Sequence, residues 1–157
     1  MASRPAADAR RAIGITTVLR QIIFGSAISL VDISVHALAM TSVIAAARAT
    51  AARRLSFPVL RLIAVMIATV AVLMAAHLCE IGIWSAAYAL VDAVPDGSDH
   101  FYFAFVNFTT LGYGDIVPVP RWRLLGPMTA MDGVLLFGWS TAVIFAVLLQ
   151  ALERDRK

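Results

Sequence analysis

The sequence has little charge and almost no cysteine. Of its 157 residues, 15% are charged and 61% are hydrophobic, whereas soluble domains carry roughly a quarter of charged residues. The low charge excludes an ordinary soluble domain and indicates a membrane protein. The single cysteine, Cys79, excludes a disulfide framework within the chain, and we expect this side chain to pack in the core.

Two further absences narrow the functional class. No apolar segment carries a ladder of arginines, which excludes a voltage sensor of the usual kind. The net charge of +3 comes from arginines at the ends of apolar segments, as loops beside lipid require, so it indicates no nucleic-acid partner. Only a short tail, 153–157, follows the last apolar segment, so we expect no soluble gating module unless a separate protein supplies one.

Three apolar segments are long enough to cross a bilayer, which takes about 20 residues. They cover 13–47, 59–91 and 124–152. Residues 1–12 are polar and rich in arginine, and we expect them to form a loosely ordered tail. The sequence thus predicts an all-α membrane protein with three spanning helices.

The first apolar segment has an alternative interpretation as a secretory signal, because small residues at 45–47 resemble a cleavage site. Its length and the acid that it contains, Asp32, argue against this, since signal peptides have an apolar region of roughly 7–15 residues. Trp84 and Tyr88 lie near the end of the second segment, and Trp122 precedes the third. We expect these aromatic rings to lie at the membrane interfaces.

A short aromatic segment, 100–109, follows a loop that contains Pro95 and Gly97. At about ten residues it is too short to cross, so it predicts a re-entrant helix buried in protein or lining water. Ser98 or Asp99 is placed to cap this helix. The acids of the preceding loop either concentrate cations at a pore mouth or form an ordinary solvated loop; they are Asp92, Asp96 and Asp99.

A glycine-rich stretch comes directly after the short helix. Gly112 and Gly114 permit positive φ, and alternating such residues with ordinary ones turns successive carbonyls to one side. A row of carbonyls, repeated in four chains, replaces the water shell of a monovalent cation. Because one chain supplies a quarter of each ring, the stretch predicts a cyclic homotetramer.

This stretch resembles the selectivity filter of potassium channels, whose signature is Thr-x-Gly-Tyr-Gly and which is usually followed by aspartate. Here the signature is Thr110–Gly114 and the aspartate is Asp115. The order spanning helix, pore helix, filter, spanning helix over 59–152 is similar to the two-helix pore module in its small prokaryotic form. The resemblance implies a non-enzymatic homotetramer in a prokaryotic cell (inner) membrane. It would conduct K⁺ passively, with K⁺ in the filter and no organic cofactor.

The resemblance also implies individual roles. Ion-coordinating carbonyls are expected at Thr110, Leu111, Gly112 and Tyr113, with filter support from Thr109, Gly114, Asp115 and Asp132. The Tyr113 ring is expected to pack on pore-helix aromatics. Gly133 matches a gating hinge, and the cavity below the filter is expected to be lined by Val134, Phe137 and Thr141.

Two positions depart from the family pattern. Val106 stands where some members have a glutamate that bonds the aspartate after the filter, so Asp115 lacks that support. Asp132 lies inside the third apolar segment, where an acid needs a partner. We predict that it braces the filter through Asn107 or Thr109; the alternative is a water-exposed acid that tunes ion concentration.

Four polar residues interrupt the first two apolar segments in spaced pairs that each share a helix face: Asp32 with His36, and His77 with Glu80. The favoured interpretation is hydrogen bonding between helices. An intramembrane metal site, or a metal-dependent membrane enzyme built on it, is the alternative. Within the channel class, a less selective cation channel is the alternative, and the intact signature with Tyr113 argues for potassium.

Orientation follows from the resemblance, which places the filter loop outside. The acid-free basic loop from Arg48 to Arg61 is then cytoplasmic, in agreement with the positive-inside rule. One crossing by the first segment puts the N-terminal arginines outside, against that rule. We favour the crossing over a helix that lies at the interface or folds back. This first helix is extra to the two-helix module, and we expect it to be peripheral to conduction.

Overall fold

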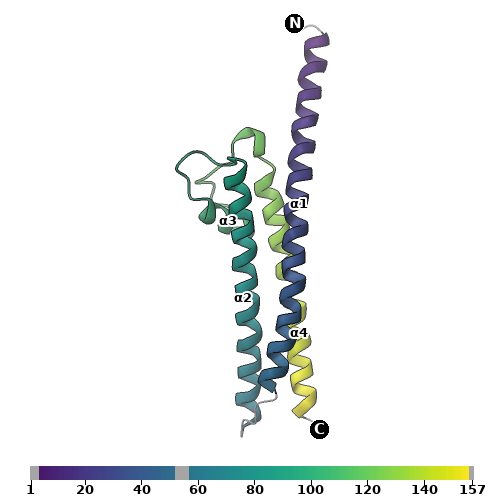
Figure 1. Cartoon of the computed structure of the whole chain (residues 1–157), viewed down its shortest axis with the longest axis vertical. Helices are drawn as coiled ribbons and strands as arrows, with labels where there is room; N and C mark the ends of the chain where they lie inside the picture. The colour runs from purple at the N-terminus through teal and green to yellow at the C-terminus, as the bar shows by residue number, and fades with distance from the viewer. Residues whose placement is uncertain (1–3, 52–56, 156–157) are drawn as a thin grey trace.

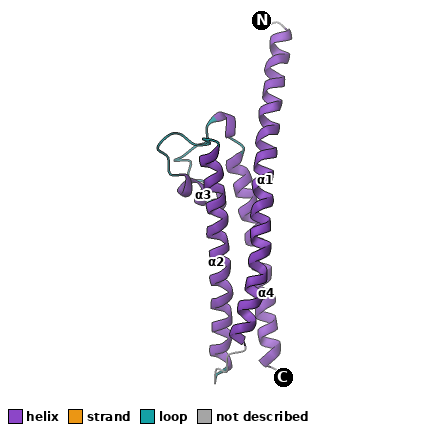
Figure 2. Ribbon diagram, viewed as in Figure 1, coloured by secondary structure: helices purple, strands orange, loops and turns teal. Residues whose placement is uncertain are grey.

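The computed structural model describes residues 4–51 and 57–155, and every regular element in these ranges is helical (Figures 1 and 2). The elements in chain order are α1 Arg4–Ala51, α2 Pro58–Leu90, α3 His100–Phe108, η1 Pro120–Trp122 and α4 Leu125–Asp155. The predicted all-α class is confirmed.

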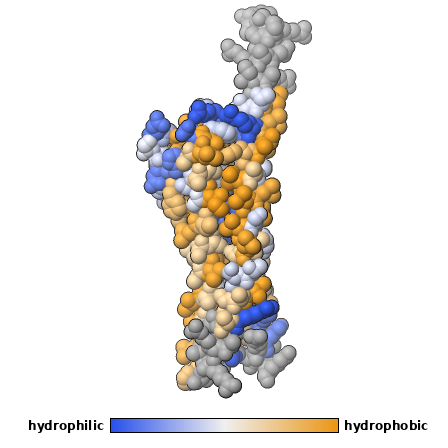
Figure 3. All heavy atoms as spheres, viewed as in Figure 1, coloured by the Kyte–Doolittle hydropathy of each residue, from blue (hydrophilic) through white to orange (hydrophobic). Residues whose placement is uncertain are grey.

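Three helical stretches are long and apolar enough to cross a membrane: Gly14–Ala49, Pro58–Leu90 and Pro120–Glu153. They lie side by side as a bundle, with α3 tucked against α2 at one end (Figure 1). The surface of the bundle is apolar along much of its length and hydrophilic at the pore-loop end (Figure 3). The chain is therefore an integral, multi-pass membrane protein.

The helix α1 begins at Arg4 and ends at Ala51, so it is longer than the apolar segment 13–47, which nearly coincides with the candidate span Gly14–Ala49. The segment 1–12, expected as a loose tail, is helical from Arg4 onward. Alanine and arginine dominate this stretch, and both favour helix. At 48 residues the helix is about 72 Å long, and its N-terminal end extends beyond the bundle on the side of the pore loop (Figure 1). This course supports a crossing helix.

The helix α3 is held between its N-terminal cap and an aromatic wall. Asp99 accepts hydrogen bonds from the backbone N–H groups of Phe101 and Tyr102, at 2.9 and 3.0 Å, which confirms one of the two predicted caps. Behind α3, Trp84 and Tyr88 are both fully buried. The prediction that they lie at the membrane interface is wrong, since a re-entrant helix needs apolar protein behind it.

Two other sequence-based placements are also wrong. Trp122 is buried, because Phe24 of α1 packs on its ring and the Arg20 guanidinium lies 4.5 Å above it. Cys79, expected in the core, is exposed. Its helix turns His77 and Glu80 inward, which leaves position 79 on the outer face.

Candidate pore and filter

The backbone after α3 alternates between left-handed and ordinary conformations. Thr110, Gly112 and Gly114 have φ of 60°, 56° and 78°, while Leu111 and Tyr113 between them are not in this region. The alternation expected from the two glycines is therefore present, and Thr110 extends it by one step. A left-handed β-branched residue is strained, so the surrounding contacts must hold Thr110 in place.

Those contacts come from the last turn of α3. The backbone N–H of Thr110 donates to the Asn107 carbonyl at 2.8 Å, and that of Leu111 donates to the Val106 carbonyl at 2.9 Å. The Gly112 N–H reaches the same Val106 carbonyl at 3.3 Å. Val106 has no carboxylate in its side chain, yet its backbone oxygen anchors the first half of the candidate filter.

The aspartate after the filter has a partner that the sequence did not reveal. The Tyr102 hydroxyl donates to Asp115 Oδ2 at 2.8 Å. Tyr102 lies in the first turn of α3, thirteen positions before Asp115, so no local spacing rule links them. The hydrogen bond to the carboxylate, which stabilises the neutral phenol, raises the pKa of Tyr102.

We expect Tyr102→Phe to weaken the support of the filter, because the substitution keeps the ring and removes only the hydroxyl that bonds Asp115. Ion flux from liposomes should fall several-fold or decay faster, while assembly is retained. A double-mutant cycle with Asp115→Asn measures the coupling. Purely additive effects of the two substitutions would contradict a direct role for this bond.

Asp132 does not bond the predicted donors. It accepts a hydrogen bond from Trp84 Nε1 of α2 at 3.1 Å. Asn107 donates instead to the Phe103 carbonyl, and the Thr109 hydroxyl donates to the carbonyls of its own helix. The prediction that these two residues link Asp132 to the filter is wrong, because α4 turns position 132 toward α2.

Gly133, matched to a gating hinge, is the point where α4 meets the end of α3. A Cβ atom at this position would collide with the carbonyl oxygen of Phe108. Gly133 therefore permits a close approach of two backbones, a role that the sequence did not indicate. The predicted cavity-lining residues occupy an exposed face of the same helix: Val134, Phe137 and Thr141.

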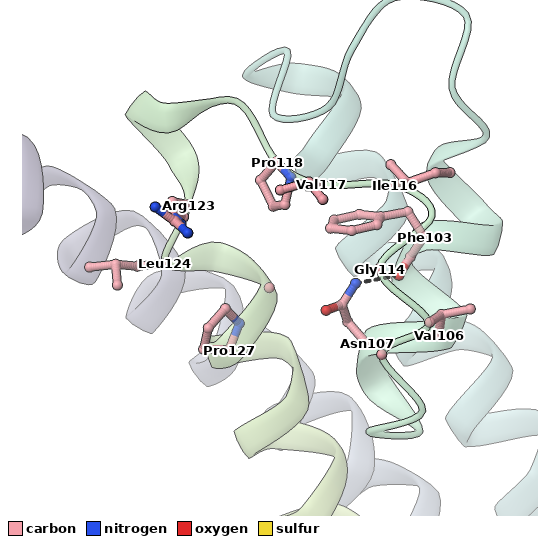
Figure 4. A pocket seen from close by; sticks show the side chains of 12 residues that line it. Phe103, Val106, Asn107, Gly114, Ile116, Val117, Pro118, Arg123, Leu124 and Pro127 are labelled. Atoms are coloured by element: carbon pink, nitrogen blue, oxygen red, sulfur yellow. Dashed lines mark hydrogen bonds between the residues drawn. The ribbon is translucent and has the colours of Figure 1, made fainter.

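A cavity of about 370 Å³ lies behind the filter, between α3 and the start of α4. In Figure 4 the rings of Phe103 and Pro118 and the side chains of Ile116 and Val117 lie around it, opposite Pro127 of α4. The dashed bond from Asn107 to Phe103 marks its α3 wall. The lining is mainly apolar, so the loop that carries the filter rests beside a space that hydrophobic groups can enter.

The four polar residues of the first two apolar segments lie in the interior of the bundle. Glu80 contacts His36 across the α1–α2 interface and His77 within α2, each at 2.8 Å. The predicted hydrogen bonding between helices is confirmed for His36 and Glu80. These contacts also argue against a merely peripheral α1, because removing it would leave Glu80 without His36.

Comparison with known proteins agrees with this geometry. A family model described as ion channel matches residues 76–150. The chain is also 45% identical over 47 residues to the potassium voltage-gated channel protein shk-1 of Caenorhabditis elegans. Together, the two matches support a potassium-channel pore module within residues 76–150 of the chain.

Both matches cover only part of the chain. The ion-channel match begins at residue 76, so the first half of α2 and all of α1 lie outside it. The nematode match covers 29% of this chain and 9% of the relative, so the chain corresponds to a small part of that protein. No solved structure matches the chain.

Proposed function

We propose that the chain forms a potassium-selective channel through a homotetrameric pore. The observation that carries this proposal is the alternating left-handed backbone of the filter, at Thr110, Gly112 and Gly114. Carbonyl rings built from this stretch replace the hydration shell of K⁺ and offset the cost of dehydration. Ions in single file repel one another, which keeps them moving. Similarity to a nematode potassium channel protein supports K⁺ as the ion.

Exposure of the pore-side residues supports assembly into a tetramer. In one chain, Leu111 and Tyr113 of the filter are 54% and 66% exposed, and Val134 of α4 is 59% exposed. A closed cyclic assembly would cover such surfaces and complete each carbonyl ring. The predicted packing surface for the Tyr113 ring would then come from a neighbouring copy. The filter would face outside and the Arg48–Arg61 loop would lie in the cytoplasm.

Reconstitution into liposomes with opposed K⁺ and Na⁺ gradients tests the proposal. We expect K⁺ flux far above Na⁺ flux, together with a cross-linked species of four chains. Equal fluxes of K⁺ and Na⁺ would favour a less selective cation channel. The absence of flux in assembled protein, together with stoichiometric metal and hydrolytic activity, would favour a membrane enzyme instead.

A further inference from the structure

Four buried side chains from three helices form a closed ring of polar contacts, which we name the polar ring: His36 of α1, His77 and Glu80 of α2, and Ser140 of α4. Each oxygen of the Glu80 carboxylate contacts the Nδ1 atom of one histidine at 2.8 Å. On the far side of the rings, Ser140 Oγ lies 3.0 Å from His77 Nε2 and 3.5 Å from His36 Nε2.

When both histidines are neutral, the polar ring has too few donated hydrogen atoms to satisfy all of its buried hydrogen-bond acceptors. A carboxylate only accepts, so each Nδ1 must donate to Glu80. Each Nε2 is then an acceptor, and both face Ser140, whose hydroxyl has one proton to give. One buried acceptor is left unsatisfied, which is costly. The polar ring therefore needs an additional cation.

A second buried acid lies beside the polar ring. Asp32 is fully buried, and its two carboxylate oxygens make no hydrogen bond of good geometry among the described residues, because the nearby Trp84 indole N–H donates to Asp132. It lies one turn before His36 in α1 and within electrostatic range of Asp132 and Glu80. Buried charges are paired or coordinate metals. The acids in this part of the interior therefore favour an added cation.

We propose that His36, His77 and Glu80 bind a divalent transition-metal ion, with zinc as the best match. Each of the three offers a ligand atom, and these atoms all lie within 4.8 Å of one another. Two imidazole nitrogens and a carboxylate oxygen are a donor set that suits zinc. The family match assigns conduction and does not account for this group, which includes a residue of α1 outside the matched segment.

Metal binding would leave no Nε2 atom as an unsatisfied acceptor. With the metal on the Nδ1 side of both rings, each Nε2 carries a hydrogen. The Ser140 oxygen has two lone pairs and accepts from both rings. Metal-bound histidines usually donate their other ring N–H to such an outer partner. Asp32, outside the three-ligand group, supplies the second negative charge.

A single extra proton would also complete the hydrogen bonds of the polar ring, but it would leave Asp32 unpartnered. A site that holds a proton and a site that holds a metal ion differ in their affinity for metals, so direct binding measurements distinguish the two. The location also matters for conduction, because the His77 ring packs 4.8 Å from Phe137 and 6.0 Å from Phe108. A bound ion would join α1 to α2 beside the end of the pore helix and the cavity face of α4.

The test uses the full chain in detergent, stripped with a chelator and freed of any histidine tag. Titration with ZnCl₂ should give one Zn²⁺ per chain, and CoCl₂ should give the visible d–d absorption of a nitrogen- and oxygen-ligated ion. His36→Gln and Glu80→Gln should each weaken Zn²⁺ binding by more than about tenfold. His100→Gln, at the start of α3, is the matched control and should bind like the parent.

Gel filtration checks that each variant assembles, and a thermal unfolding scan gives a second measure. Zn²⁺ should raise the unfolding temperature of the parent and of His100→Gln, and this shift should vanish in His36→Gln. Substoichiometric Zn²⁺ in the parent, or equal affinity in the parent and both ligand variants, would overturn the proposal and leave the proton as the occupant. Because binding is measured without ion flux, this outcome is independent of the proposed potassium selectivity.

Discussion

A Gly112→Ala variant should enter the membrane and assemble, yet carry no K⁺ above background in liposomes. Gly112 has φ of 56° and open space around its Cα, so the substitution causes no collision. Its cost is conformational, because an L side chain in the left-handed region costs about 1–2 kcal/mol per chain. Four strained copies in one ring would turn the carbonyls away from the ion path.

Gly97→Ala is the matched control for this experiment. Gly97 also has a positive φ, 78°, and open space, but it lies in the loop before α3. The same backbone strain is thus imposed away from the filter, and K⁺ flux should persist. If Gly112→Ala conducts as well as the parent, the assignment of the filter is wrong.

Gly133→Ala should have a comparably large effect through a different cause. The new methyl group would meet the Phe108 carbonyl oxygen, and rotation of a side chain cannot relieve a clash with backbone. Overpacking usually costs about 1–3 kcal/mol, and occasionally more. Here α4 must move away from the end of α3, which directly precedes the filter. We expect less assembled protein and loss of K⁺ flux in what remains.

Gly82→Ala in α2 provides the comparison, since a Cβ there meets nothing within 4 Å and alanine is the better helix former. It should leave flux and thermal stability unchanged or slightly improved. A Gly133→Ala protein with normal assembly and flux would show that the contact between α4 and α3 can relax, and a hinge at this position would then explain the glycine better.

The pore module was largely predictable because its signals are local. Gly112 and Gly114 permit the left-handed conformations of the filter wherever the chain goes, and the length of 100–109 fixes a helix too short to cross. Asp99 caps its helix through neighbours two and three positions away. Such features depend on residues close in sequence, so one sequence is enough to identify them.

The partners across helices were not predictable in the same way. Asp132 bonds Trp84, and Asp115 bonds Tyr102, because of how each helix is rotated and how far it is shifted along its neighbour. Spacing shows which residues share a face, as for His77 and Glu80, but not which helix that face meets. In a bundle surrounded by lipid, hydrophobicity does not reveal which face meets another helix, because the outer surface is as apolar as the interior.

The polar ring also restricts which parts of the protein can move. Sliding α1 past α2 by one turn, about 5.4 Å, would separate His36 from Glu80 and strand both groups in an apolar interior. The two helices are therefore expected to move as one body. Polar contacts also join α4 to this body, since Ser140 Oγ lies 3.0 Å from His77 Nε2 and Trp84 bonds Asp132 at 3.1 Å. Any opening motion of the inner helix is therefore expected in the part of α4 after Ser140, where Val147 packs in an apolar cluster with residues of α1 and α2.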